Sequence, residues 1–432
     1  MFILAVLATR WASGYSVLAH ESIIDSVWDQ QIRQVLLKRF PGTGADGILK
    51  ARAHAYGGCI IQDMGYYPLG SHLFSDLVHY VRSGDFVEVL ISEAQDVNEY
   101  AFALGALAHY AADNTGHPLA TNLSVPLLYP KQRAKFGNVM TYAQYPAGHL
   151  QTEFAFDVLQ VARGLYTPEA YHSFIGFEVA KPLLERAFLK TYGFELKDAF
   201  TNLDLAIGTY RFTIASVVPQ MTKVALATRE KQIKENMPQF DRKKFAFSLA
   251  KKQYDKEFGS TYRKPGWFAR FLSWVFRVVP KVGPFKALAF HSPTPQVEKL
   301  FIESFDKTVK IYSELLAGAS TGKLQLKNTN FDTGGPVVPG NYELADNAYA
   351  ELARKLASQK DGPGNAEMLA NILEFYRDMS RPFATKKHEK EWRNTVSALE
   401  KLKAAPRGSA ISNRPDPRSL TAVPSVAAAQ YR

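Results

Sequence analysis

Apolar residues recur at helical spacing in segment after segment of this 432-residue chain. Between residues 20 and 40 they stand three or four positions apart, and Pro41 and Gly42 end the pattern. Alternating patterns typical of strands are hard to find. The pattern predicts helices over 20–40, 47–63, 73–82, 88–115, 145–163, 176–192, 200–227, 295–316, 341–359 and 365–379. We therefore expect an all-α fold.

Charge and histidine content divide the chain into two unlike halves. Residues 1–200 hold 15 basic and 19 acidic residues, whereas the remainder carries a net charge of +15. Seven of the ten histidines lie between His20 and His149. The single cysteine, Cys59, excludes a disulfide scaffold and any multi-cysteine zinc or iron–sulfur site. With 46% hydrophobic residues, the chain is also too apolar to be disordered throughout.

Composition along the chain predicts four segments. A short apolar run, Phe2–Ala8, precedes the small residues Ala12 to Gly14 and resembles a truncated signal peptide, with a buried N-terminal element as the alternative. No stretch reaches about 18 uninterrupted apolar residues, so we expect no transmembrane helix. The expected segments are a signal peptide (1–14), a histidine-rich helical domain (15–225), a basic, aromatic-rich helical extension packed on it (226–385), and a basic, largely disordered tail (386–432). A signal peptide would place the protein in the periplasm or outside the cell.

The most informative motif is ALAHYAADNTGHP, residues 106–118. His109, Asp113 and His117 stand four residues apart, and each four-residue step turns a helix by only about 40°. All three side chains can therefore point in the same direction. Pro118 suggests that the helix ends there, which would let His117 turn towards a shared site.

A second pair, His149 and Glu153, has the same four-residue spacing on another predicted helix. A lone pair of this kind is usually a surface ion pair or a structural hydrogen bond. Here His109 and His117 lie among apolar residues, where an unpartnered imidazole is costly to bury. Two such arrays facing each other in a helical bundle can hold metal ions. Imidazole and carboxylate ligands without thiolates favour zinc, and manganese or iron less strongly.

As an ordered set, these motifs resemble the zinc-dependent phospholipase C superfamily, which also includes the P1/S1-type nucleases. The resemblance covers roughly residues 15–220. It implies an all-α, multi-helix phospholipase C/P1 nuclease-like domain, followed in this chain by a helical, basic C-terminal extension. It also implies two or three zinc ions and their ligands, which in chain order are His20, Asp63, His79, His109, Asp113, His117, His149 and Glu153.

Three features depart from the best-known members. His117 follows the central aspartate by four residues, whereas those members have six; branches of the glycosylphosphatidylinositol-specific phospholipase D type resemble the shorter spacing. His72 competes with His79 for one ligand position, and the surrounding residues favour His79. The family's N-terminal amine ligand would belong to Tyr15 after signal cleavage, with Trp11 as the alternative.

The resemblance implies hydrolysis of a phosphodiester by a metal-activated water. Asp113 would bridge two metal ions, as its family counterpart does. Asp63 or Glu153 would orient or deprotonate the attacking water, which makes them the predicted catalytic residues.

The substrate is the most open part of the interpretation. Residues 264–290 mix aromatic residues with evenly spaced cations, a composition that suits a bilayer interface as well as a core or lid helix. We expect a phospholipase C that acts on phospholipid head groups, peripheral on a membrane surface and without an obligate protein partner. The alternatives are a P1/S1-type single-strand nuclease that binds nucleic acid and a catalytically inactive zinc-binding module.

Overall fold

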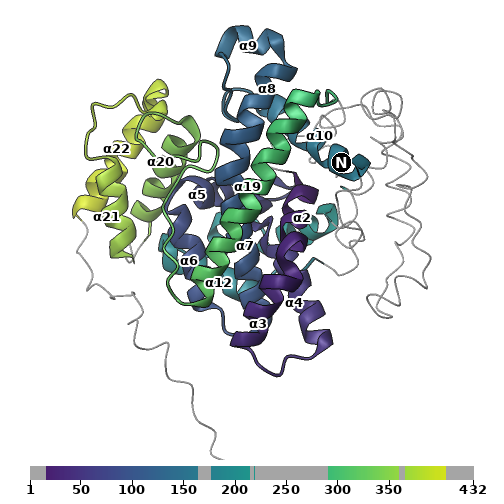
Figure 1. Cartoon of the computed structure of the whole chain (residues 1–432). Coiled ribbons are helices and arrows are strands. Elements are labelled where there is room, and N and C mark those ends of the chain that lie inside the picture. Colours follow the sequence, from purple (N-terminus) through teal and green to yellow (C-terminus); the bar gives the residue numbers. More distant parts are fainter. Residues whose placement is uncertain (1–15, 164–176, 215–217, 219–289, 360–364, 405–432) are drawn as a thin grey trace, which may run out of the picture.

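The computed structural model describes residues 16–163, 177–214, 218, 290–359 and 365–404. Over these residues the chain is helical, and the only strand-like pairing is an isolated bridge between Thr329 and Pro336 (Figure 1). The predicted all-α class is therefore confirmed. In chain order the helices are α2 (Val17–Val27), η2 (Trp28–Ile32), α3 (Arg33–Arg39), α4 (Ala45–Gly58), η3 (Ile61–Tyr66), α5 (His72–Tyr80), α6 (Ser83–Glu93), α7 (Val97–Gly116), η4 (His117–Thr121), α8 (Asn122–Leu128), α9 (Pro130–Phe136), α10 (Pro146–Arg163), α12 (Lys181–Tyr192), η5 (Leu196–Ala199), α13 (Leu203–Phe212), α19 (Pro295–Ser320), α20 (Glu343–Ala357), α21 (Ala366–Phe375), η8 (Ala384–Lys387) and α22 (Glu389–Ala404).

Helix α7 forms the centre of the molecule. It packs against α2, α4, α6 and α19, and its residues from Tyr100 to Asp113 are all buried (Figure 1). The crossing with α4 is close enough that a Cβ on Gly105 would overlap the Ala55 carbonyl oxygen. Only glycine fits such a backbone approach. The small glycine and alanine side chains of α7 therefore allow several helices to pack closely around it.

The predicted helix over 88–115 is in fact two helices, α6 and α7, separated at residues 94–96. The Asp96 carboxylate accepts hydrogen bonds from the backbone N–H groups of Asn98 (2.8 Å) and Glu99 (2.9 Å). An aspartate that satisfies the first free N–H groups in this way is a strong N-cap. This cap starts a new helix and aligns α7 independently of α6.

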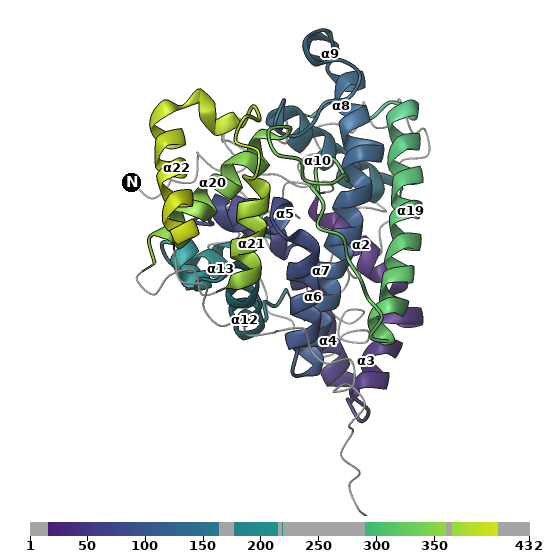
Figure 2. The same ribbon diagram turned by 90° about the vertical axis from the view of Figure 1, so that its left-hand side faces the viewer.

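The C-terminal half of the chain adds to the same core. Helix α19 lies along α7 and α2, where Tyr312 donates a hydrogen bond to the Leu104 carbonyl oxygen (2.9 Å) and Phe301 stacks on Phe156 with ring centroids 4.5 Å apart. Helices α20, α21 and α22 form a group at one side of the molecule, and α20 packs against α5 (Figure 2). Within the described part of the predicted extension, α19 and α20 thus pack on helices of the histidine-rich part, and residues 321–342 between them form turns and a loop.

The prediction of a largely disordered tail over 386–432 is wrong for residues 389–404. They form α22, which packs on α20 and buries Leu399 and Leu402. The basic residues that suggested disorder occupy the exposed side of an amphipathic helix.

Several sequence predictions fall outside the described residues. They concern the signal peptide (1–14), Tyr15 and Trp11, the boundary at 225/226, the aromatic and cationic segment up to residue 289, and the tail beyond residue 404. Among the helices that are described, none is both long and apolar enough to cross a membrane.

Candidate metal centre

The structure brings all eight predicted ligand residues into one buried cluster, although they come from six helices. His20 lies on α2, Asp63 on η3, His79 on α5, His109 and Asp113 on α7, His117 on η4, and His149 and Glu153 on α10. Each of these residues is at most 1% exposed. Three sets have ligand atoms close enough to share a metal ion: His20–His109–Asp113, Asp63–His79–His109, and His117–His149–Glu153.

Asp113 lies at the middle of the cluster. Its Oδ1 is 3.5 Å from His20 Nε2, and its Oδ2 is 3.2 Å from His109 Nε2 and 3.5 Å from His79 Nε2. His117 Nε2 is 3.9 Å from the same Oδ2. The two oxygens of one carboxylate thus face histidines of different sets, which is the arrangement that a bridging ligand needs.

The outer carboxylates each face one histidine. Asp63 Oδ1 is 3.3 Å from His79 Nε2, and Glu153 Oε1 is 3.6 Å from His149 Nδ1. Zinc bonds of about 2.0–2.1 Å to nitrogen and oxygen place neighbouring tetrahedral ligands roughly 3.3–3.4 Å apart. These separations therefore suit ligands that surround a common ion.

Backbone carbonyl groups fix the orientation of three of the histidines. Through its outward nitrogen, each ring makes one hydrogen bond: His79 Nδ1 to Ser75 (2.7 Å), His109 Nδ1 to Cys59 (3.0 Å) and His149 Nε2 to Met140 (2.7 Å). A ring that donates its proton outward keeps the other nitrogen as an acceptor for a metal ion. The inward nitrogens of these rings all face the cluster.

Many of the nitrogen and oxygen atoms that face the centre of the cluster lack hydrogen bonds that could stabilise them without a metal ion. Among the residues that the structure describes, both carboxylate oxygens of Asp63, Asp113 and Glu153 are buried without a hydrogen-bond partner, as are the inward nitrogens of His79, His109 and His149. Within the described residues, no lysine or arginine pairs with the three carboxylates. Burying such groups unpaired is costly, because each loses its hydration without compensation. The residues present therefore fit a divalent cation such as zinc.

Burial and mutual charge shift the pKa values of these groups. Burial lowers the pKa of His149 to about 3 and, with the neighbouring His109, that of His20 also to about 3. Burial raises the pKa of Glu153 well above its usual range, and the charge of Asp113 adds to this. The pKa of Asp113 is instead held well below its usual value, despite its burial, by the histidines around it. His20 and His149 are thus neutral at physiological pH, the form in which imidazole binds a metal.

His117 lies at an irregular point in the helix. The chain does not leave the helical path at Pro118, as the sequence suggested, but continues through the π-helix η4 into α8. Single π-helical turns are rare and occur frequently at functional sites, because the extra residue shifts the direction of the side chains. The predicted turn of His117 towards the cluster is therefore made by a π-helix rather than by a helix end.

The two other described histidines of this half, His72 and His54, lie outside the cluster. His72 is exposed at the start of α5, with its ring 5.5 Å from that of Tyr66, whereas His79 lies inside. His54 is bonded through Nδ1 to the Lys50 carbonyl oxygen (2.9 Å), as expected of a structural histidine. The geometry agrees with the choice of His79 over His72.

One acidic residue at the cluster was missed by the sequence analysis. Asp332 is 1% exposed, and its Oδ1 lies 3.2 Å from His117 Nε2. It lies just before Gly334 and Gly335, in a connection whose sequence resembles an ordinary surface turn. No helical spacing relates it to the eight predicted ligand residues. The sequence signal for the burial of Asp332 is the neighbouring Phe331, an aromatic residue in an otherwise polar loop.

Comparison with known proteins bears on the first half of the chain. Residues 19–202 match the sequence model of the family described as zinc dependent phospholipase C. No curated protein and no solved structure gives a significant match. The matched range contains all eight predicted ligand residues and agrees closely with the resemblance found in the sequence. Residues 19–202 of this chain are therefore similar to the zinc-dependent phospholipase C family, and this match supports membership of that family.

Proposed function

We propose that this protein is a zinc-dependent hydrolase that cleaves the phosphodiester bond of phospholipid head groups, with two or three zinc ions in the buried cluster. The observation that carries the proposal is the overlap of the ligand sets: His109 belongs to two of them, and the oxygens of Asp113 face histidines of both. A single structural zinc site would need only four ligands and no shared residue. The match to the phospholipase C family supports a phospholipid substrate.

The roles of the residues follow from their geometry. Bound zinc would supply Lewis acidity that neutralises charge on the phosphate and makes water a nucleophile at neutral pH. Asp113 holds the sets together. Asp63 and Glu153 lie on either side of it with unpartnered carboxylate oxygens, and either can orient the attacking water and take its proton. His79 and His149, fixed by backbone carbonyl groups, direct their other nitrogens at these two carboxylates, so that each pair would hold a bound ion between them.

The experiment measures metal content and turnover in the same preparations. Elemental analysis should find two or three zinc ions per chain, and His109→Ala and Glu153→Ala should both lower that number. His72→Ala is the matched control, because it removes an exposed histidine from the same half of the chain and should keep the full zinc content. A chain without zinc, or zinc unchanged in both cluster variants, would refute the metal centre.

The substrate is tested with a panel of phospholipids, single-stranded DNA and RNA, and phosphomonoesters. Release of phosphorylated head groups from phospholipid vesicles, lost in Asp63→Asn, is the expected result. Cleavage of nucleic acid without cleavage of lipid would replace the phospholipase by a nuclease. Full zinc content without turnover of any substrate would leave only a binding module.

We also propose, from residues 1–14 alone, that the protein is exported to the periplasm or secreted. N-terminal sequencing of protein recovered outside the cytoplasm should begin near Tyr15. An uncleaved chain retained in the cytoplasm would overturn this proposal.

A further inference from the structure

Asp332 lies beside His117 and has the place that a backbone carbonyl group has beside the three fixed histidines of the cluster. His79, His109 and His149 each bond one ring nitrogen to a carbonyl oxygen, whereas neither nitrogen of His117 has a hydrogen bond of good geometry among the described residues. Its closest acidic neighbour is Asp332, whose Oδ1 is 3.2 Å from Nε2. A small rotation of the imidazole would convert this contact into a hydrogen bond.

The carboxylate of Asp332 is held firmly from its other side. Oδ2 accepts hydrogen bonds from the hydroxyl groups of Tyr80 (2.7 Å) and Tyr342. Within the described residues, Asp332 has no lysine or arginine partner; its one ion pair is with His117. The two tyrosines thus fix the carboxylate plane and leave Oδ1 directed at the histidine.

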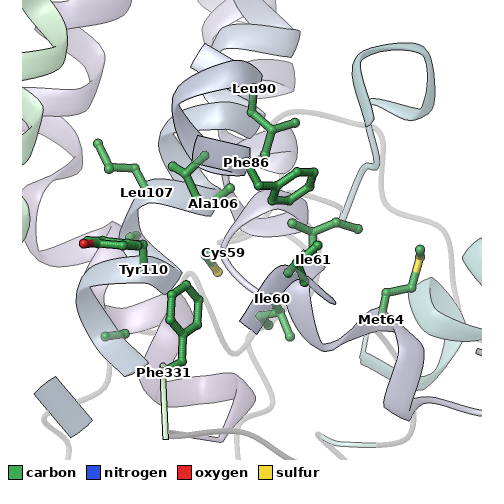
Figure 3. Close-up of a cluster of buried hydrophobic side chains, with 14 of the residues drawn as sticks. Cys59, Ile60, Ile61, Met64, Phe86, Leu90, Ala106, Leu107, Tyr110 and Phe331 are labelled. Atoms are coloured by element: carbon green, nitrogen blue, oxygen red, sulfur yellow. The ribbon is translucent and has the colours of Figure 1, made fainter. Parts of the chain in front are cut away.

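The loop that carries Asp332 is tied to the metal cluster through its backbone as well. Asn122, five residues after His117, donates its side-chain N–H to the Asp332 carbonyl oxygen (2.7 Å). The N–H of Phe331 donates to the His79 carbonyl oxygen (3.3 Å), and its ring lies 5.2 Å from that of His79. Figure 3 shows Phe331 in the apolar cluster together with Cys59 and Tyr110. These bonds place Asp332 at the cluster by several independent contacts.

We propose that Asp332 is a positioning residue of the metal centre, which binds His117 and thereby strengthens the affinity of the His117–His149–Glu153 set for a divalent cation. This inference rests on the proposed zinc centre and extends it beyond residues 19–202. Asp332 belongs to none of the three ligand sets. If His117 Nε2 donates its proton to Asp332, the buried Nδ1 is left as the nitrogen that would bind the ion, because one ring nitrogen cannot do both. Carboxylates in that position fix the tautomer and orientation of a ligand histidine and raise its basicity, and their loss typically costs about 10–100-fold in metal affinity.

The test is a zinc titration of metal-free full-length protein against a competing chelator. Asp332→Asn keeps the size of the side chain and removes its charge; we expect about 10–100-fold weaker binding of one zinc equivalent, with the others unchanged. Asp346→Asn is the matched control. Asp346 is equally buried in the same half of the chain, but within the part that the structure describes its carboxylate accepts hydrogen bonds from the backbone N–H groups of Gly340 and Ala384 and contacts no histidine of the cluster. This variant should leave every zinc affinity unchanged.

A double variant shows whether Asp332 acts through His117. In a His117→Ala background, Asp332→Asn should cost nothing further; a full additional loss would refute the positioning role. Unchanged zinc affinities in Asp332→Asn would refute the inference, whereas a wild-type chain that binds no zinc would instead refute the proposed function. If Asp332→Asn does not fold, Tyr342→Phe takes its place: it keeps the carboxylate but loosens it, and the same zinc equivalent should bind more weakly. Unchanged affinity in that folded variant would overturn the inference.

Discussion

Removal of zinc should destabilise the protein strongly, because the metal cluster lies in the core. The carboxylates of Asp63, Asp113 and Glu153 are buried together, and in the described part of the chain no lysine, arginine or hydrogen-bond donor pairs with their oxygens. Without metal, the folded protein must keep these groups unpaired or take up protons, whereas the unfolded chain hydrates them. The folded state should therefore depend on the bound ions for much of its stability.

The expected loss of stability depends on how many of the ligand sets bind an ion. One ion that binds only the folded state stabilises it by about 4 kcal/mol when its free concentration is about 1,000 times its dissociation constant. Two such ions contribute about 8 kcal/mol, which is comparable to the whole stability of a typical domain, about 5–15 kcal/mol. Since 1 kcal/mol shifts the Tm of a domain of 150–250 residues by roughly 2–4 °C and that of a larger folding unit by less, the loss of one ion should lower the Tm by at most about 8 °C.

Thermal unfolding followed by circular dichroism measures this effect. Protein in the presence of zinc is compared with protein dialysed against a chelator, and zinc is then restored to the second sample. His72→Ala should respond as the wild type does, because His72 lies outside the cluster. An unchanged Tm after complete removal of zinc would refute the conclusion that the cluster is held together by metal ions.

Three further changes test other parts of the molecule. Tyr312→Phe, which removes the hydrogen bond to the Leu104 carbonyl oxygen, should lower the free energy of unfolding by about 1 kcal/mol in denaturant titrations and leave zinc content unchanged. Burial raises the pKa of Asp157 to about 7, above the value of about 3.9 in the unfolded chain. Between these two pH values the folded state binds one proton more than the unfolded state, so the free energy of unfolding should fall as the pH rises. Asp157→Asn should reduce this pH dependence. A chain that ends after residue 218 should unfold without a cooperative transition, because it lacks α19; a cooperative, zinc-dependent transition in that fragment would contradict the observed packing.

The helices could be predicted from sequence because their apolar periodicity is a local property. The predicted ranges 145–163 and 295–316 lie close to α10 and α19, since in both an apolar stripe faces the core. The break between α6 and α7 was missed because one N-cap, Asp96, interrupts an otherwise continuous helical pattern. The order of α22 was missed for a different reason: its apolar residues are few, and their burial depends on α20, which is distant in sequence.

The metal ligands could be predicted where the spacing within one helix relates them. His109, Asp113 and His117 lie on one face by helical geometry, and so do His149 and Glu153. The convergence of His20, Asp63 and His79 on the same point could not be derived from spacing, since each comes from a different helix. Their assignment came from the family resemblance, and the structure now gives the distances that make it physically reasonable.

The part of the site that could not be predicted lies where the family match ends. The segment before Asp332 is bonded to the first half of the chain at successive points: Asn328 Oδ1 accepts from the N–H groups of Gly84 and Asp85 at the start of α6, and Ser83 Oγ bonds to Thr329. These contacts satisfy N–H groups that the first turn of α6 would otherwise leave free. Asp332, four residues after Asn328, then lies beside His117. The second half of the chain thus completes the start of α6 and places an acidic residue beside the metal cluster, so the folding unit is larger than the 19–202 range that matches the family. The activity proposed for this protein should therefore depend on residues outside the range that matches the family.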